Sequence, residues 1–246
     1  MLDVAKELEK AVARFWKVRG QQKKRQGASS GRKDAGERSS VTGGKHADGF
    51  VNLIAAIVSD AGLPKVKVHI KEKRPRTLPG FYRLCKEWDL VVISGDSLVA
   101  VIEVKSQVGS FGNNFNNRVE EALGNATDFW AAYREGLFKP SQKPWLGYLF
   151  MLEEKLESTR PTKPLILQPY PVDSKFQGRS YAERYELTCQ RLVRDRLYDA
   201  ACFFTSNAVT GKRGKFREPN SELSIRNFAI SLQARALAFA KQARTI

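Results

Sequence analysis

Apolar residues recur along this chain with two different periods, and each period predicts a different kind of element. Helical spacing near the N-terminus predicts a first helix over residues 2–16 and a second from about Ala47 to a stop at Gly62. Alternating basic and apolar residues over 65–76 predict a strand with one solvated, cationic face. The stretch EWDLVVISGDSLVAVIEVKSQ, residues 87–107, predicts two apolar strands joined by a tight turn.

The second half of the chain continues with longer elements. Helical spacing predicts a helix over residues 113–136, and the apolar run at 145–154 predicts a buried strand that precedes a proline-punctuated loop around 161–171. Helical periodicity returns over residues 181–204 and 224–243. Strands in the middle of the chain with helices on both sides predict an α/β fold, with a central mixed β-sheet flanked by helices.

Length and charge limit the number of domains and the class of partner that we expect. A chain of 246 residues lies just below the length at which single cores usually split, so we expect one domain over residues 1–246. Residues 20–45 are polar, basic and rich in glycine and serine, which predicts a basic loop that orders only on binding a partner. The formal charge of +16 favours a polyanionic partner, above all nucleic acid, over a basic protein without one.

Several classes of protein do not fit the sequence. No apolar run approaches the roughly 18 residues needed to cross a bilayer, which predicts a cytoplasmic protein without a membrane partner. The three cysteines are far apart and lack metal-type spacing, so neither a disulfide framework nor a zinc site is indicated. No glycine-rich Lys-Ser/Thr loop for a nucleotide phosphate is present.

The apolar hairpin at 87–107 carries charges where burial is expected. Alternate residues of a strand share a face, so Glu103 and Lys105 lie side by side, and an antiparallel partner strand brings Asp89 close to Glu103. Asp89 faces Glu103 only with an odd-length loop or a bulge, which we expect near residues 94–98. A two-residue turn without a bulge would instead set Asp89 opposite Ile102.

Two adjacent carboxylates repel each other unless a cation lies between them. Magnesium prefers oxygen ligands and binds through one or two carboxylates, which makes Mg2+ the expected cofactor at Asp89 and Glu103. With Lys105 beside them, the three residues predict metal-assisted hydrolysis of a phosphodiester. Two alternatives stay open: a non-catalytic nucleic-acid-binding protein in which these residues form a structural ion pair, and a nuclease of repair or junction resolution.

The Asp89 and Glu103-Val104-Lys105 pattern resembles the PD-(D/E)xK nuclease superfamily, with Trp88 where the motif has proline. The segments GERSSVTGGKHADGF and GNNFNNRVEEALGNATDFW make the chain similar to the XhoI-type restriction endonucleases. That resemblance implies a Type II restriction enzyme that acts as a homodimer on double-stranded DNA at CTCGAG. It also implies cleavage after the first C with magnesium, in a restriction-modification system with a cognate DNA methyltransferase.

Further candidates for ligand binding flank the hairpin. Asp48, at the start of the second helix, is either a third metal ligand or a helix cap. The expected DNA-contacting residues are amides and cations that suit base edges and phosphates, namely Gln107, Asn113, Asn114, Asn116, Asn117, Arg118, Lys212 and Arg213. The asparagines have helix capping as their alternative role, and the two basic residues at 212 and 213 also suit a solvated loop.

Overall fold

The computed structural model describes residues 2–29, 47–63, 66–70 and 72–242, with side chains omitted over 23–29. Its longer helices run over Val4–Ser29 (α1), Asp48–Asp60 (α3), Phe111–Arg134 (α5), Tyr181–Arg194 (α7) and Ile225–Gln242 (α8). Short helical turns occur at Lys73–Arg76 (α4), Leu156–Thr159 (α6), Gly211–Arg213 (η1) and Ser221–Leu223 (η2). The strands are Val66–His69 (β1), Thr77–Pro79 (β2), Cys85–Glu87 (β3), Leu90–Ser94 (β4), Ser97–Gln107 (β5), Trp145–Glu153 (β6) and Ala200–Ser206 (β7).

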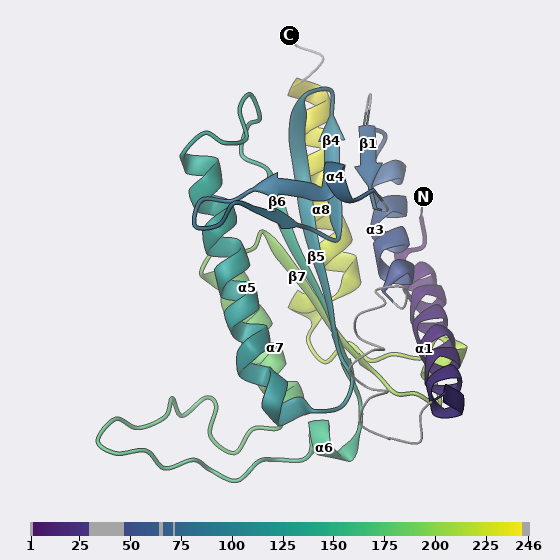
Figure 1. The fold of residues 1–246 in the computed structure, drawn as a ribbon, viewed down its shortest axis with the longest axis vertical. Helices are drawn as coiled ribbons and strands as arrows, with labels where there is room; N and C mark the ends of the chain where they lie inside the picture. The colour runs from purple at the N-terminus through teal and green to yellow at the C-terminus, as the bar shows by residue number, and fades with distance from the viewer. Residues whose placement is uncertain (1, 30–46, 64–65, 71, 243–246) are drawn as a thin grey trace.

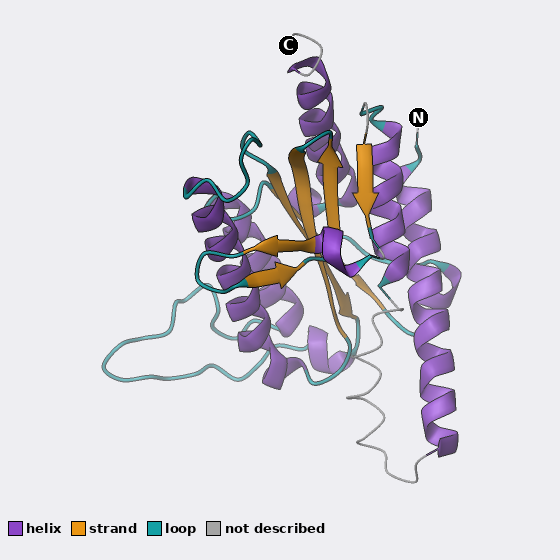
Figure 2. Cartoon of the chain, turned by 45° about the horizontal axis from the view of Figure 1, so that its top comes forward, coloured by secondary structure: helices purple, strands orange, loops and turns teal. Residues whose placement is uncertain are grey.

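Five of these strands form a central mixed sheet with the order β1-β4-β5-β6-β7. The first three are antiparallel to their neighbours, whereas β5, β6 and β7 run parallel. Strands β2 and β3 form a separate antiparallel pair that crosses in front of the sheet (Figure 2). The predicted α/β fold with a mixed sheet between helices is confirmed.

Helices cover both faces of the sheet and divide the core into two layers. Helices α1, α3 and α8 pack on one face, where Phe15, Phe50 and Phe228 are fully buried. Helices α5 and α7 pack on the other, where Phe129 and Tyr185 are buried against β4 to β7 (Figure 1). None of the helices within the described part of the chain is long and apolar enough to cross a membrane.

Three predicted elements have different bounds in the structure. The predicted loop from residue 20 is wrong as far as Ser29, because α1 continues through the Gln-, Lys- and Arg-rich stretch, whose residues favour helix. The rest of that predicted loop, residues 30–45, lies outside the described residues. The first strand ends at His69 and residues 73–76 form α4 instead of continuing it.

The helix predicted over 181–204 is also wrong at its end. Helix α7 stops at Arg194, and the chain turns at Arg196, whose φ is 57°. Residues 200–206 then form the buried strand β7. A short apolar run such as AACFF cannot be assigned to helix or strand by periodicity alone, and its aromatic residues and the tight reversal before it favour the strand.

Candidate active site on strands β4 and β5

The hairpin between β4 and β5 combines a two-residue turn with a β-bulge. Ser94 pairs with Ser97 across Gly95 and Asp96, and Gly95 has the positive φ of 60° that such a turn requires. The register then shifts between Val92 and Ile93, and Val99 is left as the extra residue of β5. The bulge that we expected is therefore present, one residue beyond the predicted range of 94–98.

The bulge restores the register that the site requires. Leu90 pairs with Ile102, so Asp89 and Glu103, one step further along each strand, stand opposite each other. Both lie on the face covered by α5 and α7, which their neighbours Val91 and Val101 also share. The Asp89 carboxylate accepts a hydrogen bond of 2.7 Å from the backbone N–H of Val104, which fixes it against β5.

Glu103 is 1% exposed and lies between two lysines. The ammonium of Lys105 lies 2.6 Å from its Oε1 atom, and the ammonium of Lys86 lies 3.1 Å from its Oε2 atom. From α5, the Asn125 amide donates a longer contact of 3.5 Å to Oε1, and Glu121 lies 3.9 Å from Lys105. Lys86 donates its hydrogen bond of 3.2 Å to Oε1, so the buried Oε2 atom has an ionic contact with Lys86 but accepts no hydrogen bond.

Burial and neighbouring charges shift the pKa values of the Asp89 and Glu103 carboxylates in opposite directions. Burial, and then the neighbouring Glu103 carboxylate, raises the pKa of Asp89 to about 6 from 3.8. Burial would also raise the pKa of Glu103, but Lys105 and Lys86 hold it below its usual value. The pKa of Lys105 is raised, since the attraction of Glu103 outweighs the effect of burial on the ammonium. The site therefore keeps Glu103 ionised while Asp89 can take up a proton.

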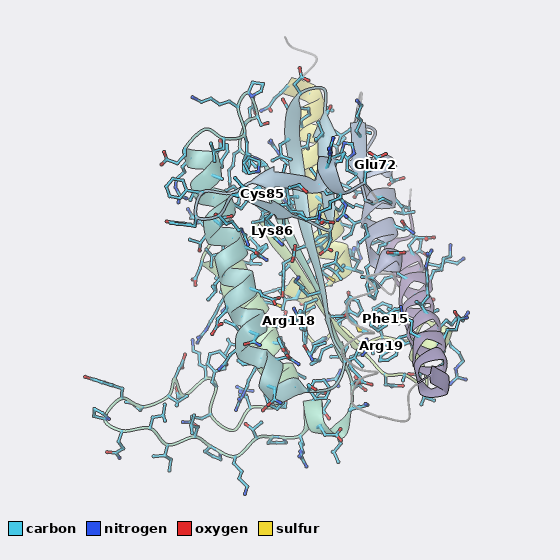
Figure 3. The ribbon with its side chains drawn as sticks, viewed as in Figure 1. Phe15, Arg19, Glu72, Cys85, Lys86 and Arg118 are labelled. Carbon is cyan, nitrogen blue, oxygen red and sulfur yellow. The ribbon has the colours of Figure 1, made fainter. Side chains whose placement is uncertain are left out.

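Lys86 is the residue that sequence analysis missed. It comes from β3, in the small sheet that crosses the central one, and its ammonium also lies 4.6 Å from the centre of the Trp88 ring (Figure 3). No spacing rule connects Lys86 to Glu103, because the contact depends on how the β2–β3 pair folds over β5. The nearest signal in the sequence is that Lys86 and Arg83 are the two basic residues that shortly precede Trp88.

Trp88, which directly precedes Asp89, has a structural role. Its indole is 2% exposed and packs edge-on against Phe129 of α5 at 5.5 Å between ring centres. Its backbone N–H donates to the carbonyl of Arg76, and the Arg76 guanidinium donates back to the Trp88 carbonyl. These bonds fix the segment that delivers both Lys86 and Asp89.

Asp48 does not join the pair on β4 and β5. It begins α3, which packs on the opposite face of the sheet, and its carboxylate lies 4.0 Å from the Arg14 guanidinium. The N-cap residue of α3 is Ala47, so Asp48 does not stand at the helix-cap position. Within the described residues, no cluster of three or more His, Cys, Asp or Glu side chains could hold a metal ion. Two carboxylates are nevertheless sufficient for an ion that completes its shell with water and substrate oxygens.

The predicted DNA-contacting residues differ in exposure. Asn113, Asn116 and Asn117 are exposed in the first turns of α5, which Ser110 precedes, whereas the partly buried Asn114 donates to the Ser110 carbonyl. Gln107 is 5% exposed and donates to the carbonyl of Gly109, so its amide already has a structural partner.

The three predicted DNA-contacting cations also differ in exposure and in position. Arg118 points from α5 toward Glu121, with which it forms an ion pair, and its side chain is only 20% exposed (Figure 3). Lys212 and Arg213 are exposed on η1, which packs against α1 on the other side of the sheet. The asparagines and Arg118 therefore share a helix with Asn125 of the carboxylate site, and the cations of η1 do not.

The comparisons with known proteins agree on one family. Residues 25–218 match the family model described as "Restriction endonuclease XhoI". The Type II restriction enzyme BstVI of Geobacillus stearothermophilus is 45% identical over 207 residues, which cover 81% of this chain and 91% of that protein. The Type II restriction enzyme XhoI of Xanthomonas vasicola is 44% identical over 183 residues, 74% of this chain and 72% of that protein.

A third relative, the Type II restriction enzyme AbrI of Azospirillum brasilense, is 44% identical over 161 residues, 65% of this chain and 71% of that protein. No solved structure matches this chain significantly. The family model covers most of the chain, including both strands of the carboxylate hairpin. The chain therefore belongs to the XhoI family of restriction endonucleases and is a Type II restriction enzyme, a site-specific DNA endonuclease.

Proposed function

We propose that this enzyme cleaves duplex DNA by Mg2+-dependent hydrolysis at a PD-(D/E)xK centre formed by Asp89, Glu103 and Lys105. The observation that carries the proposal is the bulged hairpin, which sets two carboxylates opposite each other and places the Lys105 ammonium 2.6 Å from one of them. Paired carboxylates with an adjacent ammonium suit a divalent ion and the charge that develops on a phosphate in hydrolysis.

Asp89 and Glu103 would hold the ion, and their surroundings fit that role. The Oε2 atom of Glu103 is buried without a hydrogen bond, and the anionic form of Asp89 is destabilised by burial and then by the Glu103 carboxylate, so a cation would stabilise both carboxylates. Magnesium supplies a Lewis acid that polarises the phosphate and activates water. Lys105 remains charged and donates toward the same space, where it would bind a phosphate oxygen and stabilise its negative charge. Asp48 contributes a ligand only if α3 moves, so we leave it out of the proposed centre.

DNA binding is supported by the net charge of +16 and by the placement of α5. The exposed amides of Asn113, Asn116 and Asn117 suit base edges, and adenine in particular. The side chain of Arg118 suits phosphates. Lys212 and Arg213 suit them as well, but they lie on η1, which packs against α1 on the other face of the sheet. Asn114 and Gln107 would contribute indirectly, because their side chains donate hydrogen bonds to backbone carbonyls that hold the start of α5.

By likeness to the XhoI family, we propose the palindrome CTCGAG as the site, with cleavage of each strand after the first C. A homodimer suits this target, because a two-fold protein matches a two-fold site and each active site then cuts one strand. The biological task would be defence against foreign DNA in the cytoplasm, with a cognate methyltransferase that protects the host copies of the site.

Plasmid cleavage followed by sequencing of the fragment ends tests the proposal in one experiment. Purified protein is incubated with a plasmid that contains one CTCGAG site, with Mg2+ or with a chelator. A single Mg2+-dependent cut with staggered ends after the first C would support the site, the metal and the symmetry together. Binding without cleavage would favour the non-catalytic alternative, and nicking that follows DNA structure instead of sequence would favour a repair or junction nuclease.

A further inference from the structure

The turn between β2 and β3 exposes three large apolar side chains within four residues. Phe81 is 48% exposed, Tyr82 is 71% exposed and Leu84 is 92% exposed. The rings of Phe81 and Tyr82 pack edge to face at 4.8 Å between centres, so they form one aromatic surface instead of two separate side chains. Exposed apolar groups gathered in this way usually mark a contact with another molecule.

This aromatic turn, residues 80–84, is held rigidly on α5. The buried carboxylate of Asp128 accepts hydrogen bonds from the backbone N–H groups of Phe81 (2.9 Å) and Tyr82 (2.8 Å). Its other oxygen accepts a hydrogen bond of 2.8 Å from Nε of Arg83. Gly80 closes the turn so tightly that a Cβ atom there would lie 2.6 Å from the carbonyl oxygen of Arg83. The rings are therefore presented in a fixed position, which lowers the entropic cost of binding.

The aromatic turn is connected to the catalytic carboxylates. Arg83 donates a hydrogen bond of 3.0 Å to the Asn125 side chain, and the same amide donates toward Oε1 of Glu103 at 3.5 Å. Strand β3 leaves the turn and delivers Lys86 to the carboxylate of Glu103. The turn that carries the exposed rings is thus joined through Arg83 and Asn125 to Glu103, one of the two carboxylates that would face the phosphate.

The surrounding charge decides which molecule the turn contacts. The exposed cations Lys73 and Arg74 precede the turn on α4, and Arg83 within it is 39% exposed. Lys73 pairs with Glu87 and Arg83 pairs with Asp128, so the net charge of the chain, more than these two side chains, indicates the partner. Exposed aromatic rings on a chain with a formal charge of +16 suit nucleic acid, in which the bases offer flat faces and the backbone offers negative charge. A second copy of this basic chain would be repelled by the cations beside the turn, so the proposed homodimer would form through another surface.

We infer that Phe81 and Tyr82 contact the bases of duplex DNA beside the phosphate that reaches Asp89 and Glu103. The inference rests on the proposed function, since it takes the carboxylate pair as the place of cleavage. The rings supply apolar contact with bases, and Arg83 ties that contact to Asn125 and Glu103. Binding of DNA at the turn would in this way help to align the phosphate with the carboxylates.

The test compares the double variant Phe81→Ala/Tyr82→Ala with the parent chain, both in a Lys105→Ala background that is expected to bind DNA without cutting it. Ile230→Ala is the matched control, because Ile230 is 53% exposed on α8, which packs on the other face of the sheet. Affinity is measured for two duplexes of equal length, one with CTCGAG and one with a scrambled site. The fluorescent base 2-aminopurine, placed in turn at each adenine in and beside the site, reports contact with the bases.

We expect the double variant to bind roughly 5- to 150-fold more weakly for each ring that stacks, and to lose the change in 2-aminopurine fluorescence that the parent produces. The salt dependence of binding should stay the same, because no phosphate contact is removed, whereas Arg74→Ala should reduce its slope by about 1. The control should match the parent in both measurements. All variants should keep the melting temperature of the parent, since the rings are exposed.

Two results would overturn the inference. One is an unchanged affinity and an unchanged fluorescence response in the double variant. The other is a loss of affinity that sedimentation traces to a change of oligomeric state, which would make the turn a protein interface. A parent that binds both duplexes equally would count against the CTCGAG site alone, and a loss of affinity for both duplexes in the double variant would still support the base contact.

Discussion

Lys86 lies 3.1 Å from Oε2 of Glu103 and Lys105 lies 2.6 Å from Oε1, so one buried carboxylate is paired with two ammonium groups. The two lysines come from different sheets, β3 and β5, and Lys86 also donates a hydrogen bond of 3.2 Å to Oε1. Burial of an ion in the protein interior costs several kcal/mol unless it is paired. The chain therefore compensates the charge of Glu103 with its own cations when no metal is bound.

Replacement of Lys86 by methionine should destabilise the metal-free protein by about 1–3 kcal/mol, because a buried carboxylate loses one of its two partners. The loss should be smaller in Mg2+ than in chelator, since the ion takes over the role of Lys86 toward Glu103. Urea unfolding in both conditions measures the difference. Lys67→Met, at an exposed position on β1, is the control and should be close to neutral. Equal losses with and without Mg2+ would show that Lys86 does not compete with the ion.

Lys105→Ala should keep DNA binding and lose cleavage. The ammonium of Lys105 lies against Glu103 and would stabilise charge on the phosphate during the reaction, a contribution typically worth about 100- to 1,000-fold in rate. Single-turnover cleavage of a plasmid, with affinity measured separately in chelator, distinguishes the two effects. Lys105→Arg keeps the charge and should fall between the alanine variant and the parent. Undiminished cleavage by Lys105→Ala would remove this residue from the mechanism.

Asp89 should make the stability of the metal-free protein depend on pH. Its pKa in the folded protein is about 6, above the value of 3.8 in the unfolded chain, so folding favours the protonated form. This stabilisation is fully present below about pH 4 and is lost as the pH rises through about 6. Its size is on the order of 2 to 3 kcal/mol. The free energy of unfolding of the parent minus that of Asp89→Asn, measured in chelator, should therefore fall across this range.

Asparagine is the suitable reference, because its side-chain oxygen can still accept the hydrogen bond from the Val104 N–H. Addition of Mg2+ should reduce the fall, since a cation stabilises the ionised carboxylate. A difference that stays flat between pH 4 and pH 7 in chelator would contradict the raised pKa of Asp89.

The hairpin shows how far sequence reasoning reaches at this site. Alternation along the two strands predicts that Asp89, Glu103 and Lys105 share one face. Asp89 and Glu103 can stand opposite each other only if the connection has an odd number of residues or a bulge. The structure has the bulge, with Val99 as its extra residue inside β5, and keeps the two-residue turn at Gly95 and Asp96. The sequence predicts that the connection between the strands contains one extra residue. The position of that residue, in a loop or in a bulge, depends on packing against both core layers.

The parts that sequence reasoning missed all depend on contacts between distant segments. Lys86 reaches Glu103 only because the β2–β3 pair folds across β5, and Asp128 holds the aromatic turn from 45 residues away. Residues 200–204 of β7 fall within the predicted helix 181–204, because a short apolar run fits either element, and the pairing of β7 with β6 decides the outcome. Local periodicity thus predicts the elements, and tertiary contacts complete the site.

Trp88→Pro should destabilise the protein even though proline is the residue that the proposed PD-(D/E)xK motif would have at this position. Proline has no N–H to donate to the Arg76 carbonyl, a bond of 2.9 Å, and it leaves a cavity beside Phe129. Loss of the buried indole alone should cost about 3–5 kcal/mol. Trp88→Phe keeps the N–H and a ring, so we expect it to cost only roughly 1–2 kcal/mol. Urea unfolding followed by circular dichroism measures both, and a proline variant as stable as the phenylalanine variant would show that Trp88 does not hold the segment carrying Lys86 and Asp89.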